Sequence, residues 1–74
     1  MYKNRTEQLA DDLRAEIAAG LYDDTGQIPS LTQLRDRSGL SLQSVQRVIG
    51  VLKKEGLVYS IPGRGVYVKD GRDG

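Results

Sequence analysis

The sequence predicts a mostly α-helical domain with a small β-hairpin, and three observations support this prediction. Apolar residues recur at helical spacing in three stretches, glycine-containing turns separate these stretches, and two β-branched and aromatic segments follow them. The chain of 74 residues is long enough for one small domain with one modest core. We expect that domain to occupy residues 6–69, between a flexible N-terminus at residues 1–5 and a disordered tail at residues 70–74.

The first helix is expected over residues 6–19. Asn4 and Glu7 have the spacing of a capping box, with Asn in place of Ser or Thr, and Gly20 can end the helix. Arg14 is expected on the solvated outer side of this helix. The apolar side is formed by residues at four-residue intervals, Leu9, Leu13, Ile17 and Leu21.

The second helix is short and begins after a loop. Residues 21–26 are polar and glycine-containing, residues 27–28 form a very short strand, and Pro29 follows. Ser30 at the N-cap and Gln33 three residues later form a capping box, so the helix begins at Leu31 and ends near Ser38. The side chains expected to be buried here are Leu31 and Leu34.

The third helix is the most strongly patterned segment. Gly39 provides the tight turn before it, Ser41 can cap its start, and Gly56 stands where a glycine would end it. One side is apolar, and we expect it to pack with Leu34 and the first helix: Val45, Val48, Ile49 and Leu52. The other side is polar: Gln43, Ser44, Gln46, Arg47 and Lys54. Such side chains can bond base edges and phosphates, although an ordinary amphipathic helix also has a solvated polar face.

Two strands are expected at the end of the domain. Residues 57–61 and 66–68 are β-branched and aromatic, and residues 62–65 form a tight connection that contains two glycines. A lone hairpin is only marginally stable in water. We therefore expect this one to lean on the helices or to pair with residues 27–28.

The charge is unevenly distributed along the chain. Residues 1–28 carry three basic and six acidic side chains, a net charge of −3, whereas residues 29–74 carry eight basic and four acidic ones, a net charge of +4. The basic part can attract phosphates, and the acidic part should face elsewhere. The third helix and the hairpin belong to the basic part.

Composition argues against several classes of function. The chain has no His and no Cys, which removes the commonest metal ligands and the commonest general base, and we see neither a carboxylate constellation nor a phosphate loop. We therefore expect neither an enzyme, nor a metal site, nor a cofactor. The absence of Cys fits a reducing cytosol, and no apolar run has membrane-spanning length, so we expect a cytoplasmic protein without a membrane partner.

The element order predicts a winged helix-turn-helix, with three helices plus a two-stranded wing. In such a fold the second helix of the pair can enter the DNA major groove. Arg64, between two glycines at the hairpin tip, would suit a narrow, electronegative minor groove. The alternative is that Arg64 is an exposed turn residue without a role.

Several sequence motifs occur together in one order. They include a Pro-Ser helix start, a Glu-Gly-Leu-Val junction and a Gly-Arg-Gly wing. With the residues around them, they resemble the DNA-binding domain of GntR-family bacterial transcription regulators over residues 6–69. The resemblance implies operator binding as a dimer, and family members usually carry a C-terminal ligand-binding domain. The residues that carry it are Ile17, Gly20, Tyr22, Ile28, Pro29, Ser30, Leu34, Ser38, Gly39, Leu40, Ser41, Val45, Leu52, Glu55, Gly56, Leu57, Val58, Gly63, Arg64, Gly65, Val66, Tyr67 and Val68.

The chain departs from the family pattern at positions expected to contact DNA. The family usually has Arg where this chain has Thr32 and Leu42, and often where it has Gln46; a small residue is usual where it has Arg35. An exposed leucine in this position can contact a thymine methyl group or a protein. These departures bear on the target sequence and on the affinity.

The residues and the resemblance together predict a sequence-specific DNA-binding transcriptional regulator, with repression favoured. The alternative is a winged-helix protein-interaction module in which DNA binding is weakened or lost. The expected partner is double-stranded DNA with an inverted-repeat operator, bound by a chain that is monomeric in free solution and dimeric on DNA or through a missing region. Gln43, Ser44 and Gln46 should read bases, and Arg47 with Lys53 or Lys54 should hold phosphates. The full candidate set is Ser30, Thr32, Ser41, Leu42, Gln43, Ser44, Gln46, Arg47, Lys53, Lys54, Gly63 and Arg64.

Overall fold

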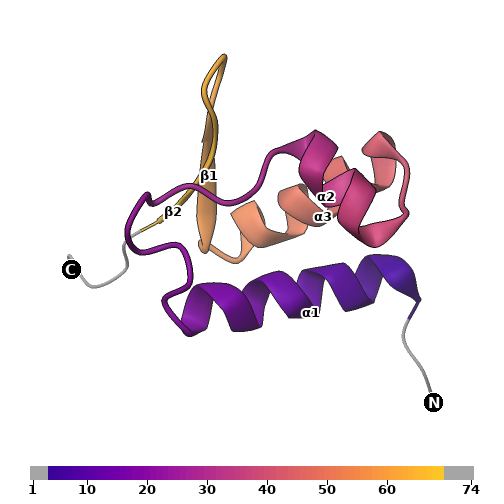
Figure 1. Cartoon of the computed structure of the whole chain (residues 1–74), viewed down its shortest axis with the longest axis horizontal. Helices are drawn as coiled ribbons and strands as arrows, with labels where there is room; N and C mark the ends of the chain where they lie inside the picture. Colours follow the sequence, from indigo (N-terminus) through magenta and orange to yellow (C-terminus); the bar gives the residue numbers. More distant parts are fainter. Residues whose placement is uncertain (1–3, 70–74) are drawn as a thin grey trace.

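Three helices precede one antiparallel hairpin in the computed structural model, which describes residues 4–69 (Figure 1). This confirms the predicted fold class. The outermost residues, 1–3 and 70–74, on which the predictions of flexible ends largely fall, lie outside the described residues. The elements are α1 (Arg5–Ala18), α2 (Leu31–Ser38), α3 (Leu42–Lys54), β1 (Val58–Ile61) and β2 (Gly65–Val68).

Side-chain caps fix where the helices begin. The Asn4 carboxamide oxygen accepts a hydrogen bond from the Glu7 backbone N–H at 2.8 Å, and the Ser30 hydroxyl accepts one from Gln33 at 3.1 Å. Glu7 and Gln33 return a bond to the N-cap backbone, so both predicted capping boxes are present. α1 begins one residue earlier than predicted, because Asn4 is the cap and Arg5 the first helical residue.

The core lies between α1 and α3 and is closed by α2 and the hairpin. Ile17 and Leu31 were expected inside it, but both are only half-buried and pack against its edge. Leu21, expected on the apolar side of the first helix, lies beyond the end of α1 and is 64% exposed. Ile17 lies in the last turn of α1, where the helix passes the edge of the core. The buried residues are Leu9, Ala10, Leu13, Ile28, Leu34, Val45, Val48, Ile49, Leu52 and Val58.

The hairpin does not stand alone. β1 and β2 pair from Val58 opposite Val68 to Ile61 opposite Gly65. A third segment pairs with the free edge of β2 through a bridge between Gln27 and Tyr67, so the predicted contact with residues 27–28 is confirmed. The strands begin at Val58 and Gly65, each offset by one residue from its predicted start. In the described part of the chain, no helix is long and apolar enough to cross a membrane.

Candidate nucleic-acid interface

α3 presents opposite properties on its two sides. Val45, Val48 and Leu52 are at most 1% exposed and point into the core, which fixes the rotation of the helix about its own axis. The polar side chains therefore point to solvent as a consequence of packing. The exposed ones are Gln43, Gln46, Arg47, Lys53 and Lys54, and we call these five residues the outer face of α3.

The first turn of α3 combines a polar cap with an exposed leucine. The Ser41 hydroxyl accepts from the Ser44 backbone N–H and donates to the Ser44 hydroxyl, both at 3.2 Å. Ser44 is half-buried and keeps its own hydroxyl proton for a further acceptor. Leu42 is 41% exposed beside this cap, so an apolar side chain lies in solvent at the start of α3.

The start of α2 places two further candidates in solvent. Ser30 and Thr32 are both exposed. Ser30 has a structural role, because its hydroxyl accepts the capping hydrogen bond from the Gln33 backbone N–H. Thr32 has no hydrogen bond of its side chain within residues 4–69, so its hydroxyl can bond a phosphate.

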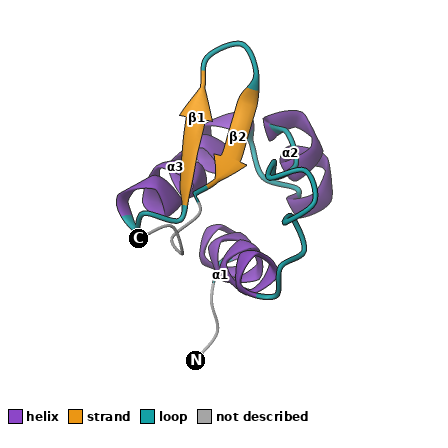
Figure 2. Ribbon diagram, turned by 90° about the vertical axis from the view of Figure 1, so that its left-hand side faces the viewer, coloured by secondary structure: helices purple, strands orange, loops and turns teal. Residues whose placement is uncertain are grey.

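The wing tip extends beyond the helices (Figure 2). Arg64 is exposed there, and its backbone N–H bonds the Ile61 carbonyl at 2.9 Å to close the turn. Gly63 has a φ of 78°, a conformation that favours glycine. Gln27, which we did not predict as functional, holds this turn: its side-chain amide donates to the Arg64 carbonyl at 3.1 Å.

Gly65 allows that support from Gln27. A Cβ atom on Gly65 would lie 2.5 Å from the Gln27 amide nitrogen, so any larger residue would displace it. The bridge between Gln27 and Tyr67 brings the two segments together. A polar residue in a very short strand was the only sequence signal for this role.

The basic side chains fall into two groups. Arg14, Arg35 and Arg37 are ion-paired with carboxylates. Within residues 4–69 the other basic side chains make no ion pair, and four of them lie on the outer face of α3 or at the wing tip. These unneutralised cations are available to phosphates: Arg5, Arg47, Lys53, Lys54, Arg64 and Lys69.

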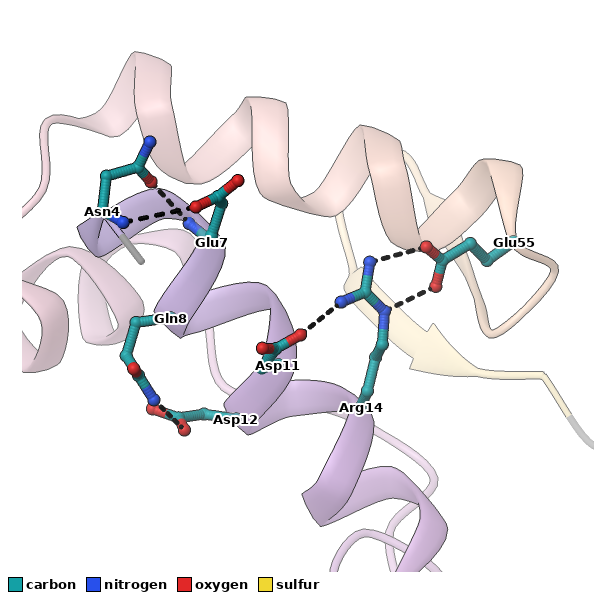
Figure 3. A network of polar contacts seen from close by, with 7 residues as sticks. All are labelled: Asn4, Glu7, Gln8, Asp11, Asp12, Arg14 and Glu55. Carbon is teal, nitrogen blue, oxygen red and sulfur yellow. Dashed lines mark hydrogen bonds and ion pairs between the residues drawn. The ribbon is translucent and has the colours of Figure 1, made fainter. Parts of the chain in front are cut away.

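Arg14 joins α1 to the end of α3 (Figure 3). Its Nε and Nη2 atoms donate to the two carboxylate oxygens of Glu55 at 2.8 and 2.6 Å, and Nη1 donates to Asp11 at 2.7 Å. The hydrogen bond from Arg14 lowers the pKa of Glu55, and the same bond raises the pKa of Arg14. Arg14 was expected to be a solvated side chain; it is instead a clamp that ties the C-cap of α3 to α1.

A second network joins α2 to α1. The Arg37 guanidinium donates to both carboxylate oxygens of Glu16, and the Tyr22 hydroxyl donates to one of them. Burial works to raise the pKa of Glu16, but the hydrogen bonds from Arg37 and Tyr22 outweigh it and lower that pKa. Burial and the bond to Glu16 raise the pKa of Tyr22. The two networks thus hold α2 and α3 against the same helix.

Solved structures share this arrangement. The DNA-binding domain of AraR, solved in complex with its operator ORR3, superposes with a TM-score of 0.83 at 26% identity, over 92% of this chain and 82% of that one. A GntR family transcriptional regulator from Listeria monocytogenes superposes with a TM-score of 0.85 at 21% identity, over 96% of this chain and 62% of that one. The similarity to the Listeria monocytogenes protein shows a shared fold and nothing more.

Sequence relatives are longer than this chain. The helix-turn-helix-type transcriptional regulator RB1450 of Rhizobium meliloti is 37% identical over 62 residues, which are 84% of this chain and 25% of the relative. The regulator Rv0792c of Mycobacterium tuberculosis is 38% identical over 63 residues, 85% of this chain and 23% of the relative. The chain therefore spans about a quarter of the length of these relatives. Residues 5–68 match the bacterial regulatory proteins of the gntR family, and the chain belongs to that family.

Proposed function

We propose that this chain is the DNA-binding domain of a cytoplasmic transcriptional regulator and that it binds an operator. One observation carries the proposal: the outer face of α3 presents amides and unneutralised cations, while the inner face is locked in the core. Amides and cations are the groups that bond base edges and phosphates. AraR, which shares the fold, was solved with operator DNA. Occupation of an operator then excludes polymerase, which makes repression the expected outcome.

The residues of the outer face, together with the half-buried Ser44 beside it, fall into two groups by the DNA contacts expected of them. Gln43, Ser44 and Gln46 lie in the first two turns of α3 and contact base edges, and Gln is suited to bidentate bonding of adenine. Arg47 and Lys54 contact phosphates of the flanking DNA strand, because their side chains are long and their charges are unpaired within residues 4–69. Arg64 reaches the neighbouring minor groove from the wing tip.

Two copies bind an inverted repeat better than one copy binds a half-site. A single domain offers only a few cations to phosphates, and each contributes modestly at physiological salt. Pairing on DNA makes the second contact intramolecular and can raise the apparent affinity about 100-fold. We expect a monomer in free solution, and sedimentation at tens of micromolar without DNA measures this; a stable dimer there would contradict the expectation.

The test is a gel-shift titration against a random duplex pool over a range of salt concentrations, followed by selection of the bound sequences. Binding should weaken as salt rises, with a slope of about −0.9 in log affinity against log salt for each phosphate contacted. A variant with Arg47, Lys54 and Arg64 changed to Ala should have a shallower slope. Arg35→Ala serves as the control, because Arg35 is already paired with Asp36 at 3.4 Å and should leave the slope unchanged.

A second candidate is a winged-helix protein-interaction module. The exposed Leu42 favours it, because that apolar side chain lies where the family usually has arginine. Absence of binding to every duplex at low salt would support this candidate and reject DNA binding.

A further inference from the structure

Gly50 is a glycine in the interior of α3 that the helix itself does not require. Glycine destabilises a helix interior relative to alanine. Every other glycine within residues 4–69 has a positive φ, a conformation that L-residues rarely adopt, but Gly50 does not. Its backbone conformation is therefore no reason for the absence of a side chain.

Packing within the chain does not explain the glycine at position 50 either. A Cβ atom built on Gly50 meets no atom of another segment within 4 Å, so the added methyl would lie in open space. Gly50 is itself exposed. An alanine would fit the fold and improve the helix, so the chain's own structure does not favour glycine here.

The position of Gly50 on the helix suggests a reason for the glycine that lies outside the chain. It follows Gln46 by four residues and precedes Lys54 by four, so it lies on the same side of the helix as the outer face. Arg47 precedes it by three residues and Lys53 follows it by three, so both lie almost one helical turn away. The unneutralised charges on both sides select an anionic partner.

We infer that Gly50 is the point where a sugar–phosphate backbone of the bound DNA lies directly against α3. This inference rests on the proposed function. Without a Cβ atom, a ligand can approach the helix backbone closely. That approach brings phosphates within reach of Arg47 on one side of Gly50 and of Lys54 on the other. Gly50 is thus a positioning residue for the phosphate contacts of its neighbours.

The experiment measures stability and DNA binding of Gly50→Ala and Gly50→Leu beside the unchanged chain. Gly50→Ala should raise Tm, yet it should weaken binding to the selected duplex by about tenfold, or about 1.4 kcal/mol. Gly50→Leu should weaken binding further. Both variants should also flatten the salt dependence, because Arg47 and Lys54 are lifted from their phosphates. A merely structural role would leave that slope unchanged.

Ala15→Leu is the matched control, since it adds bulk to an exposed position of α1 away from α3's outer face. It should leave affinity and salt slope as they are. If the unchanged chain binds duplex DNA but the Gly50 variants bind as tightly, with the same slope, this inference is overturned and the proposed function stands. If the unchanged chain binds no duplex even at low salt, the proposed function fails and the inference falls with it.

Discussion

The two sides of α3 have different roles, one in folding and one in the proposed binding, although they belong to one helix of 13 residues. The inner side is aliphatic and buried, and any change there alters the free energy of unfolding. The outer face is exposed and has no ion pair within residues 4–69, so the fold gains little from its side chains. Stability and binding should therefore be separable by substitution on one helix.

Val48 tests the inner side and should give the largest effect. Val48→Ala removes methyl groups from a site that is 1% exposed and should lower the free energy of unfolding by about 1–3 kcal/mol. Val48→Asp buries a charge without a partner and should prevent folding. Thermal and denaturant unfolding measure both. A nearly unchanged Tm for Val48→Ala would contradict the burial of this side.

Gln46 tests base reading on the outer face. Gln46→Ala should leave Tm almost unchanged and should relax the preference at one base pair, by about 1–3 kcal/mol of discrimination. Selection of bound duplexes with the variant measures this. An equal loss of affinity on every sequence would show that Gln46 does not read a base.

Lys54 tests phosphate contact on the same face. Lys54→Ala should weaken all sequences alike and should reduce the salt slope by about 0.9. Arg35→Ala is a suitable comparison, because Arg35 is a cation that is already paired, with Asp36 at 3.4 Å. A sequence-dependent loss for Lys54→Ala would contradict the separation of base reading from phosphate contact.

The sequence predicted what local interactions determine. The caps Asn4, Ser30 and Ser41 bond residues three positions away, so the helix starts follow from short-range chemistry. The inner side of α3 follows from its apolar period. The polar candidates on its outer face are exposed as predicted, since residues opposite a buried stripe must face solvent. Their contacts with DNA stay a prediction.

Side-chain contacts between distant segments could not be predicted in this way, although the pairing of the hairpin with residues 27–28 was. Arg14 and Glu55 are 41 residues apart, and Gln27 and Arg64 are 37 apart. Each contact exists only because the core brings its two segments together. The half-burial of Ile17 has the same origin, because periodicity identifies the side of a helix but not where the neighbouring core ends.

The smallest expected effect concerns the network that holds α2 against α1, which should matter to stability and not to the outer face. The pKa of Glu16 lies below its ordinary value of 4.5 in the folded chain, owing to the bonds from Arg37 and Tyr22 that outweigh burial. A lowered carboxyl pKa stabilises the fold fully above pH 4.5, and this contribution is lost as the pH falls from there through the folded pKa. Because Arg37 and Glu16 keep 38% and 23% of their side-chain surfaces in solvent, which screens the pair, Glu16→Gln should lower stability at neutral pH by only about 0.5 kcal/mol.

The sign of the pH dependence makes this small effect measurable. The difference in unfolding free energy between the unchanged chain and Glu16→Gln should shrink as the pH is lowered below 4.5, because the carboxylate of the unchanged chain then becomes protonated. Asp24→Asn removes an exposed loop carboxylate outside this network and serves as the comparison. DNA affinity at neutral pH should be the same for all three proteins, since Glu16 supports α1 and α2 and lies outside the outer face of α3. A loss of affinity in Glu16→Gln would show that the support of α2 and the presentation of α3 are coupled, and the two sides of α3 would then not be separable.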